Sequence, residues 1–357
     1  MSMGLAQWFK SLLAPATGSR LLLSARDDAD GRHYAVAYRL DGKQVFATQV
    51  AQRCHGVVEH PQQRVALFVA RRPGTECYLL DLRDGSLLQT LAARPGRHFY
   101  GHAVLHASGE WLYTTENDTR EPGRGVIGVY RFEHQRLVQV DELPSHGIGP
   151  HELAWLPDGE TLVVANGGIR TEAESRVDMN LHAMEPSLVM MNRKGCLLSK
   201  ETLEQPMNSI RHLAIAADGT VLACQQFMGD ASQGAPLLAI KRPGHPLQAF
   251  AASAQQLQRM AHYSASVAVH DRLRLVALTA PRANRFFVWH LDTGATYLEA
   301  TLPDCAAVAA VEHGFVVTSG QGRCRLLDCR HTAPVVTPLA LPAGFWDNHM
   351  HMTPFAT

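Results

Sequence analysis

The chain has 357 residues, and its 33 Lys and Arg residues equal its 33 Asp and Glu residues. This balance argues against a nucleic-acid binder, which usually carries a basic excess, and against a polybasic membrane surface. Apolar residues make up 46% of the sequence, which is enough for a large core. No apolar run reaches the roughly 18 residues that span a bilayer. The seven cysteines form no CxxC pair, so we expect no thiolate zinc site.

Residues 1–19 lack the charged start and long apolar region of a secretory signal, and we expect them to form an N-terminal extension. From about residue 20 onward the sequence repeats. Each unit starts at a histidine or a small residue, runs as an apolar strand, turns, and returns as a second apolar strand. The unit starts are residues 55, 102, 151, 212, 264, 307 and 349. Their spacing of about 50 residues is typical of β-propeller blades.

A third strand follows in every unit, as in CYLLDLRDG (77–85) and FFVWHLDTG (286–294), and each ends in a turn signal. A fourth strand comes next, for example LLQTLA (87–92). The chain opens with strands two to four of a blade and ends with a first strand near residue 349. The sequence therefore predicts an all-β fold, a seven-bladed propeller of residues 20–357. Pairing of the C-terminal inner strand with the N-terminal strands would close the ring.

The repeat phase places histidines at the start of the first strand in five blades. In a propeller this strand lines the central channel, so the five side chains approach one axis. They are His55, His102, His151, His212 and His349. Although a single such histidine more often bonds a neighbouring backbone, we expect at least three of these to converge on a transition metal. The preferred set is the consecutive trio His55, His102 and His151, with Glu116 nearby.

Polar side chains at the ends of second strands should face the same mouth of the channel. We expect this group to bind a ligand together with one residue of the long loop 167–186, which could cover the mouth as a lid. The predicted ligand-binding residues are Arg71, Glu116, Asn166, Arg176, Gln226 and Arg282. Arginines in such a position suit a carboxylate-bearing ligand.

Several motifs in the chain resemble one bacterial family. They include GHAVLHASGEWLYTTEND (101–118), IGPHELAWLPDGETLVVANGGI (148–169) and the closing WDNHM (346–350). Together they resemble the propeller proteins grouped as domain of unknown function 1513. The resemblance implies a periplasmic protein, encoded near imelysin-type iron-uptake proteins and di-haem oxidoreductases, and it carries no catalytic assignment. A more distant similarity is to the seven-bladed lactonase and muconate-cycloisomerase group.

Three classes of function follow from these observations. The first is a periplasmic protein that binds a transition metal or metal complex, with copper, iron, zinc or haem as the cofactor and iron-uptake proteins as partners. The second is a lactonase or cycloisomerase with a histidine as general base. The third is a propeller that recruits a protein partner. The nitrogen-rich inner ring favours the first class over calcium-dependent lactonases, which need oxygen ligands.

Overall fold

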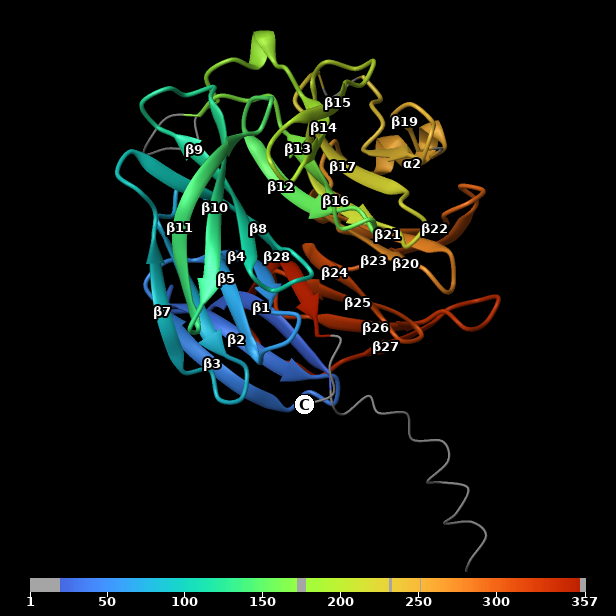
Figure 1. Cartoon of the computed structure of the whole chain (residues 1–357). Helices are drawn as coiled ribbons and strands as arrows, with labels where there is room; N and C mark the ends of the chain where they lie inside the picture. The colour runs from blue at the N-terminus through green and yellow to red at the C-terminus, as the bar shows by residue number, and fades with distance from the viewer. Residues whose placement is uncertain (1–19, 172–177, 231–232, 251, 354–357) are drawn as a thin grey trace, which may run out of the picture.

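The computed structural model describes residues 20–171, 178–230, 233–250 and 252–353. Within these residues the strands form seven four-stranded antiparallel sheets, arranged as blades around a central axis (Figure 1). The seven-bladed propeller expected from the repeats is confirmed. Across the same residues we find no helix with the length and apolar character of a membrane span.

Each blade is one sheet of four strands, which are described here from the channel outward. The innermost strands are β4 (Cys54–Glu59), β8 (Arg97–Leu105), β12 (Pro150–Trp155), β16 (Asn208–Ile215), β20 (Ser266–His270), β24 (Cys305–Val311) and β28 (Phe345–Met352). The second strands are β1 (Leu21–Asp27), β5 (Val65–Ala70), β9 (Trp111–Asp118), β13 (Thr161–Asn166), β17 (Val221–Phe227), β21 (Leu275–Ala280) and β25 (Gly314–Ser319).

The outer half of each blade completes the sheet. The third strands are β2 (His33–Arg39), β6 (Glu76–Asp81), β10 (Gly125–Glu133), β14 (Ser187–Asn192), β18 (Leu238–Lys241), β22 (Arg285–His290) and β26 (Cys324–Asp328). The outermost are β3 (Gln44–Val50), β7 (Leu87–Ala92), β11 (Arg136–Pro144), β15 (Leu197–Glu201), β19 (Gln248–Ala249), β23 (Thr296–Thr301) and β27 (Val335–Pro338). The described helical segments are short: η1 (Leu181–Ala183), α2 (Ala254–Arg259) and η2 (Pro281–Ala283).

The core lies between the blades, where the face of one sheet packs on the next. All six residues of β5 are buried because both faces of this strand are covered. Phe46 of the first blade meets Phe68 of the second with ring centroids 6.5 Å apart. Burial on both faces explains why these strands read as continuous apolar runs in the sequence.

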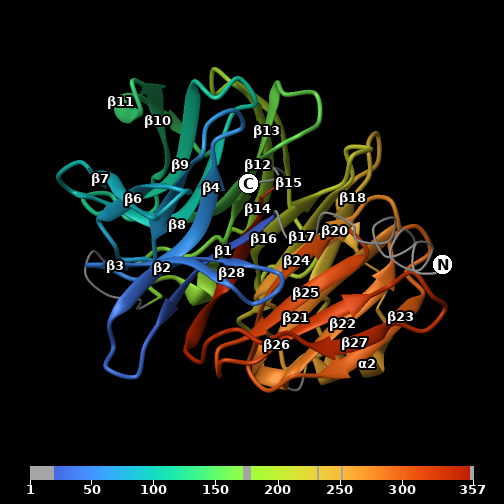
Figure 2. The ribbon, with the colours of Figure 1, turned by 90° about the horizontal axis from the view of Figure 1, so that it is seen from below.

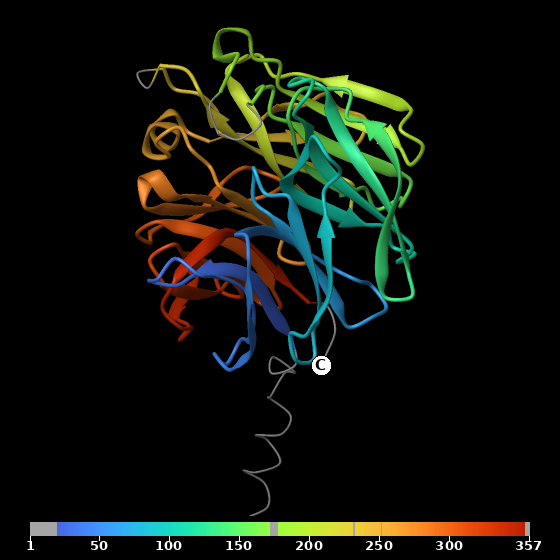
Figure 3. The ribbon, with the colours of Figure 1, turned by 90° about the vertical axis from the view of Figure 1, so that its left-hand side faces the viewer.

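The first and last strands that the structure describes share one blade, as the sequence predicts. Strand β28 pairs antiparallel with β1, at the place where the blue and red ends of the ribbon meet (Figures 2 and 3). Trp346 lies opposite Arg26 in the register. The Trp346 side chain is 2% exposed and its ring lies 5.6 Å from that of Tyr38. The amide of Leu21 donates a 2.9 Å hydrogen bond to the hydroxyl of Thr353. This pairing closes the ring and places the last inner strand beside the channel.

Candidate functional site

Five histidine rings meet in the central channel, each from the inner strand of a different blade. The ring centroids of His55 and His349 are 4.3 Å apart, and those of His151 and His212 are 4.5 Å apart. The fifth ring, His102, lies 4.9 Å from that of His55. Even His55 and His212, whose blades are not neighbours, are separated by only 5.9 Å. The structure therefore brings together all five predicted histidines, in a channel that is narrow at this level.

A smaller set comes close to the geometry that a metal ion requires. One ring nitrogen from each of His55, His102, His212 and His349 lies within 4.8 Å of the other three. Metal–nitrogen bonds of about 2.1 Å in a tetrahedron place ligand nitrogens about 3.4 Å apart, so these rings would close inward around an ion. His151, which the sequence analysis placed in the preferred trio, is outside this group, and His212 belongs to it instead.

Irregularities in strand pairing coincide with the histidine positions. The register of each histidine-bearing inner strand shifts against its neighbour at or beside the histidine. The shifts lie at 54–57 in β4, 99–103 in β8, 150–152 in β12, 210–212 in β16, and opposite 24–26 in β28. A β-bulge bends its strand and re-aims a side chain. These bulges explain how side chains from a pleated sheet come to point along one axis.

Two carboxylates contact the Nδ1 atoms of the cluster. Oδ1 of Asp347 is hydrogen-bonded to Nδ1 of His55. Oε2 of Glu152 lies 3.2 Å from Nδ1 of His212, and Oε1 lies 3.5 Å from Nδ1 of His102. A carboxylate at Nδ1 stabilises the tautomer that is protonated there, which leaves the Nε2 lone pair for a metal. Two of the four converging rings, those of His55 and His212, are thus held by a carboxylate in the way that ligating histidines are.

Burial controls the protonation of these groups. Desolvation, together with neighbouring charged groups, lowers the pKa well below 6.5 for four rings, those of His102, His151, His212 and His349. Burial likewise raises the pKa of Glu152 to about 8. It would also raise the pKa of Asp347, but His55 and two arginines outweigh it and hold that pKa well below its ordinary value. Neutral imidazoles are the form that binds metals.

Three ring nitrogens of the cluster are buried without a hydrogen-bond partner among the described residues. These atoms are Nε2 of His102, Nε2 of His349 and Nδ1 of His151. Leaving a buried polar atom unsatisfied costs about 1–3 kcal/mol, and native proteins do so rarely. The cluster thus contains three ring nitrogens that lack a partner among the described residues, and a bound metal ion or ligand could supply one.

Gly101 permits the close approach of two of these rings. Its φ is +106°, a conformation that L side chains rarely adopt, and it directly precedes His102. A Cβ atom at this position would lie 2.7 Å from Cδ2 of His55. The absence of a Cβ atom at Gly101 therefore leaves space for the His55 ring. It also allows the positive φ that the β8 backbone adopts directly before His102.

A polar cavity of about 210 Å³ opens on one side of the cluster, at the predicted mouth. Its lining comes from strand-two ends, inner-strand starts and loops. The lining residues are His55, Arg71, Arg72, Tyr100, His151, Asp178, Arg211, His212, Gln226, Met228, Tyr263, Arg282 and Asn348. The loop 167–186 borders the cavity through Asp178, on the face that the sequence assigned to it.

A second cavity, of about 280 Å³, adjoins the cluster through Glu152, His212 and His349. Small and apolar residues of β20 and β24, including Val267 and Val308, line another part of it, and β16 and β28 contribute further residues, including His351. The blades of β20 and β24 carry no histidine at the start of their inner strands. Glu152, whose side chain is 21% exposed, is one of the residues that line this cavity.

Only some of the predicted ligand-binding residues line the mouth cavity. Arg71, Gln226 and Arg282 line the mouth cavity. Asn166 is fully buried, and its Nδ2 donates a 3.2 Å hydrogen bond to the carbonyl of Ser145, so it supports a loop. Arg176 lies outside the described residues.

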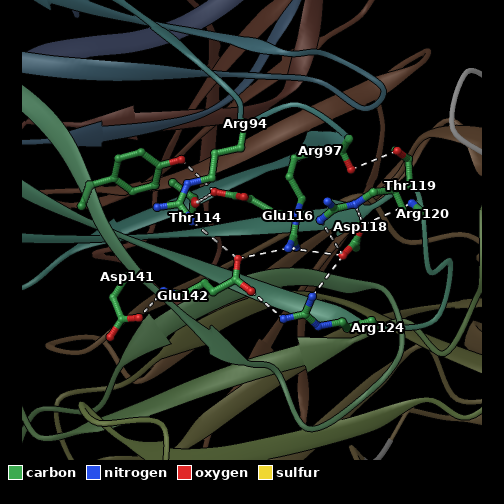
Figure 4. Close-up of polar contacts among 12 residues, drawn as sticks. Arg94, Arg97, Thr114, Glu116, Asp118, Thr119, Arg120, Arg124, Asp141 and Glu142 are labelled. Atoms are coloured by element: carbon green, nitrogen blue, oxygen red, sulfur yellow. Dashed lines mark hydrogen bonds and ion pairs between the residues drawn. The ribbon is translucent and has the colours of Figure 1, made fainter.

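Glu116 points away from the histidines, contrary to the sequence expectation. Its carboxylate accepts hydrogen bonds from the hydroxyls of Thr114 at 2.7 Å and Tyr130 at 2.8 Å (Figure 4). The adjacent Thr115 donates instead to the carbonyl of His102. Because successive strand residues face opposite sides, Glu116 lies inside the blade, where burial raises its pKa.

A separate ion-pair network lies beside Glu116 in the same blade. Arg97 is 4% exposed and bridges Asp118 at 3.3 Å and Glu142 at 3.0 Å (Figure 4). Arg124 contacts the same two carboxylates, at 3.1 and 2.5 Å. Both acids are thus paired with arginines, and the network ties β8, β9 and β11 together without joining the cluster.

Sequence reasoning missed Asp347, Glu152 and Arg211. Each is adjacent to a cluster histidine in the sequence or two residues from it, as in DNH (347–349), HE (151–152) and RH (211–212). Regular alternation would send Glu152 and Arg211 to the face of the strand opposite that of the adjacent histidine, and the bulges at these positions break that alternation. Asp347 lies two residues before His349, so regular alternation already places both on one face.

Several solved structures have a similar fold. A Bacteroides fragilis protein named as a candidate 6-phosphogluconolactonase has a TM-score of 0.66 at 11% identity, covering 95% of this chain and 99% of that one. The hydrazine synthase of Kuenenia stuttgartiensis gives 0.60 at 11% identity, with 91% and 96% covered. A nidogen/laminin complex gives 0.51 at 12%, with 80% and 94% covered. At these identities the likeness shows the propeller fold alone.

No curated protein matches the sequence. Residues 48–353 match the family described as "Protein of unknown function (DUF1513)", and this range contains all seven inner strands and all five cluster histidines. The inner strands that carry the histidines, and β28, which closes the ring, lie within this match. The strand that pairs with β28, β1, lies before it. The chain belongs to the DUF1513 family of proteins of unknown function.

Proposed function

We propose that the histidine cluster binds one transition metal ion, with His55, His102, His212 and His349 as its ligands. The observation that carries this proposal is the convergence of four imidazole nitrogens from four blades within 4.8 Å. Imidazole nitrogen suits copper, zinc, iron and nickel. The spacing leaves room for one ion between the rings, which favours a bare ion over haem at this point.

The surroundings of the rings support a ligand role better than a structural one. A structural histidine satisfies its ring nitrogens with neighbouring backbone or side chains, whereas Nε2 of His102 and of His349 have no partner in the described residues. A divalent ion is costly to bury unless its charge is balanced. Asp347 and Glu152 are close enough to the rings to supply that balance.

A periplasmic location and a role in iron or copper handling are further parts of this proposal, and they rest on the family resemblance. In such a role the propeller would hold the ion for iron-uptake proteins of the same compartment. Cell fractionation followed by metal analysis of the natural protein tests this part directly.

A second candidate function is lactone hydrolysis, and one observation favours it. His151, which is neutral because burial lowers its pKa, borders a cavity that also contains Arg71 and Arg282. A neutral histidine can act as general base while the arginines hold a carboxylate-bearing substrate. The similar Bacteroides fragilis fold agrees with this candidate at the level of architecture.

Calorimetry of the metal-free full chain, purified without a histidine tag, tests the metal proposal. We expect one equivalent of Cu²⁺ to bind, because copper has the highest affinity for such sites among the divalent ions. The double variant His102→Ala/His212→Ala should lose this binding. The control His245→Ala, changed at an exposed turn, should bind as the unchanged protein does.

The outcomes separate the two candidates. Absence of copper, zinc and iron binding would overturn the metal proposal. If the same protein hydrolyses lactones, and His151→Ala removes that activity, the enzyme function is correct instead.

A further inference from the structure

The second cavity lies on the opposite side of the cluster from the mouth. On β28, Asn348 lines the mouth cavity, whereas the residues from His349 onward line the second one. On β16, Arg211 lines the mouth cavity and Leu213 lines the second, and His212 between them lines both. The cluster is therefore flanked by a cavity on each side along the channel.

A gap in the ring of histidines leaves space on this side. The blades of β20 and β24 have Ser264 and Ala307 at the phase where the other five blades carry a histidine. Both side chains are smaller than an imidazole, and the second cavity extends along the same two strands. Its volume of about 280 Å³ is well above the roughly 30 Å³ that one water occupies, so a hydrated cation can enter it.

The residues that line the second cavity offer groups that bind cations. Glu152 supplies a carboxylate, and His212, His349 and His351 supply ring nitrogens. Among the described lining residues there is no lysine or arginine. Side-chain exposure falls from 37% at His351, through 21% at Glu152, to 3% at His212. Because burying a bare ion is costly, a series of ligands from solvent to cluster lets an ion exchange its waters in steps.

The outermost ligand of this series, His351, is held by a carboxylate. Its Nε2 lies 3.1 Å from Oε2 of Glu59, the last residue of β4. The Glu59 side chain is only 6% exposed. A carboxylate at Nε2 stabilises the tautomer that is protonated there and leaves the lone pair of Nδ1 for a metal. Asp347 holds His55 of the cluster by a contact of the same kind.

Strand β28 carries His351 one step beyond the cluster. Residues 349–352 read HMHM, and Met350 and Met352 pack against an apolar core cluster. Side chains alternate along a strand, so His351 lies on the other side, where Glu59 meets it. It is two positions from His349, or about 6.6 Å along the strand. An ion bound at His351 would thus be one short step from a cluster ligand.

We propose that the second cavity is the entrance through which the metal ion reaches the cluster, and that His351, oriented by Glu59, is the first protein ligand of the entering ion. This inference rests on the proposed metal site and adds the residues that control the rate of loading. His349 and Glu152 receive the ion next, because they line the same cavity and lie in or beside the cluster. An entrance ligand is not part of the final site, so its loss slows binding and release by the same factor and leaves Kd unchanged.

Stopped-flow mixing of the metal-free full chain with Cu²⁺, followed by tryptophan quenching, tests this inference. We expect His351→Ala to lower kon at least tenfold, while the Kd from calorimetry changes less than twofold. Glu59→Leu should also slow loading. Glu59→Gln should restore most of the rate, because its amide oxygen still accepts from Nε2 of His351. The control His245→Ala, at an exposed turn, should load at the normal rate.

Two further variants compare the two cavities as entrances. Ala310→Phe places a bulky ring in the second cavity and should slow loading at least tenfold. Met228→Trp enlarges a side chain that lines the mouth cavity and should leave the rate unchanged. Copper titration at equilibrium verifies that the cluster of each variant is intact.

The failures are distinguishable. If copper binds but His351→Ala and Ala310→Phe load at the normal rate, or if Met228→Trp slows loading tenfold, the entrance is wrongly assigned and the metal site stands. A tenfold loss of equilibrium affinity in His351→Ala would make His351 a ligand of the final site, which also contradicts the inference. If the unchanged protein binds no copper, the metal proposal is wrong and the entrance falls with it.

Discussion

Nδ1 of His55 is hydrogen-bonded to Oδ1 of Asp347, although the two residues are separated by 292 positions in the chain. This contact links the second blade to the C-terminal strand that closes the ring. It therefore joins a candidate metal ligand to the element on which the architecture depends.

Asp347→Asn should weaken both metal binding and stability. Removing one partner of a buried ion pair costs about 3–5 kcal/mol, because Arg71 would lose its charged partner and Arg53 would keep only Asp27 of its two carboxylate acceptors. Loss of a carboxylate that orients a ligating histidine lowers metal affinity by about 10–100-fold. Chemical denaturation and copper titration measure the two effects. Asp328→Asn, which breaks a surface pair with Arg330, should cost at most about 1 kcal/mol, and equal losses in both variants would contradict the assignment.

Gly101→Ala should displace the His55 ring. The new Cβ would lie 2.7 Å from Cδ2 of His55, at a φ of +106°. Gly31→Ala is the matched control, because its φ is +78° and no atom lies within 4 Å of the added Cβ. The control should lose about 1 kcal/mol from backbone strain alone, whereas Gly101→Ala should lose more and also bind copper more weakly. Identical behaviour of the two variants would show that the ring approach is unimportant.

Trp346→Ala should destabilise the ring closure by about 3–5 kcal/mol, the usual cost of removing a large buried side chain. Its neighbour Phe345 is 52% exposed, so Phe345→Ala should change stability by less than about 0.5 kcal/mol. Deletion of residues 345–357 should prevent folding, since it removes an entire inner strand. Thermal unfolding measures all three, and a folded truncation with unchanged Tm would argue against closure by β28.

Acid should destabilise the metal-free protein below about pH 6.5. Four cluster histidines have folded-state pKa values well below 6.5, so the unfolded chain binds more protons as the pH falls, and stability decreases. The limiting slope is about 1.4 kcal/mol per pH unit for each histidine. Glu152, with its pKa raised to about 8, acts in the opposite direction and offsets about one histidine. Urea denaturation at pH 5.5, 6.5 and 7.5 measures the trend, and a flat profile would contradict it.

Replacement of Glu152 by glutamine separates orientation of the rings from packing. Glutamine keeps the shape of the side chain and can still accept from the amide of Leu213, which donates to Glu152 at 2.9 Å. It cannot carry the charge that would balance a bound cation. We therefore expect copper affinity to fall about 10–100-fold while the free energy of unfolding at pH 7 changes by less than about 1 kcal/mol. Unaltered copper affinity would remove Glu152 from the site.

Part of the site was visible in the sequence because the propeller repeats. A residue at a constant phase of the repeat occupies a constant depth along the axis, so five histidines at the start of the inner strands had to approach one another. The same reasoning placed Arg71, Gln226 and Arg282 at the mouth. It failed for Glu116, because phase gives the height of a residue along the strand but not the face on which its side chain lies.

The order of strands, their number and the closure of the ring were determined by the sequence alone, through the period of apolar runs and turns. Only the tertiary structure decided which nitrogens come closest, since His212 rather than His151 joins the set within 4.8 Å. It also decided that Asp347 and Glu152 meet the rings and that Arg211 lines the mouth cavity. The physical reason is that each bulge rotates a few residues of one strand by an amount set by the pairing partner, and pairing between distant segments has no local signature in the sequence.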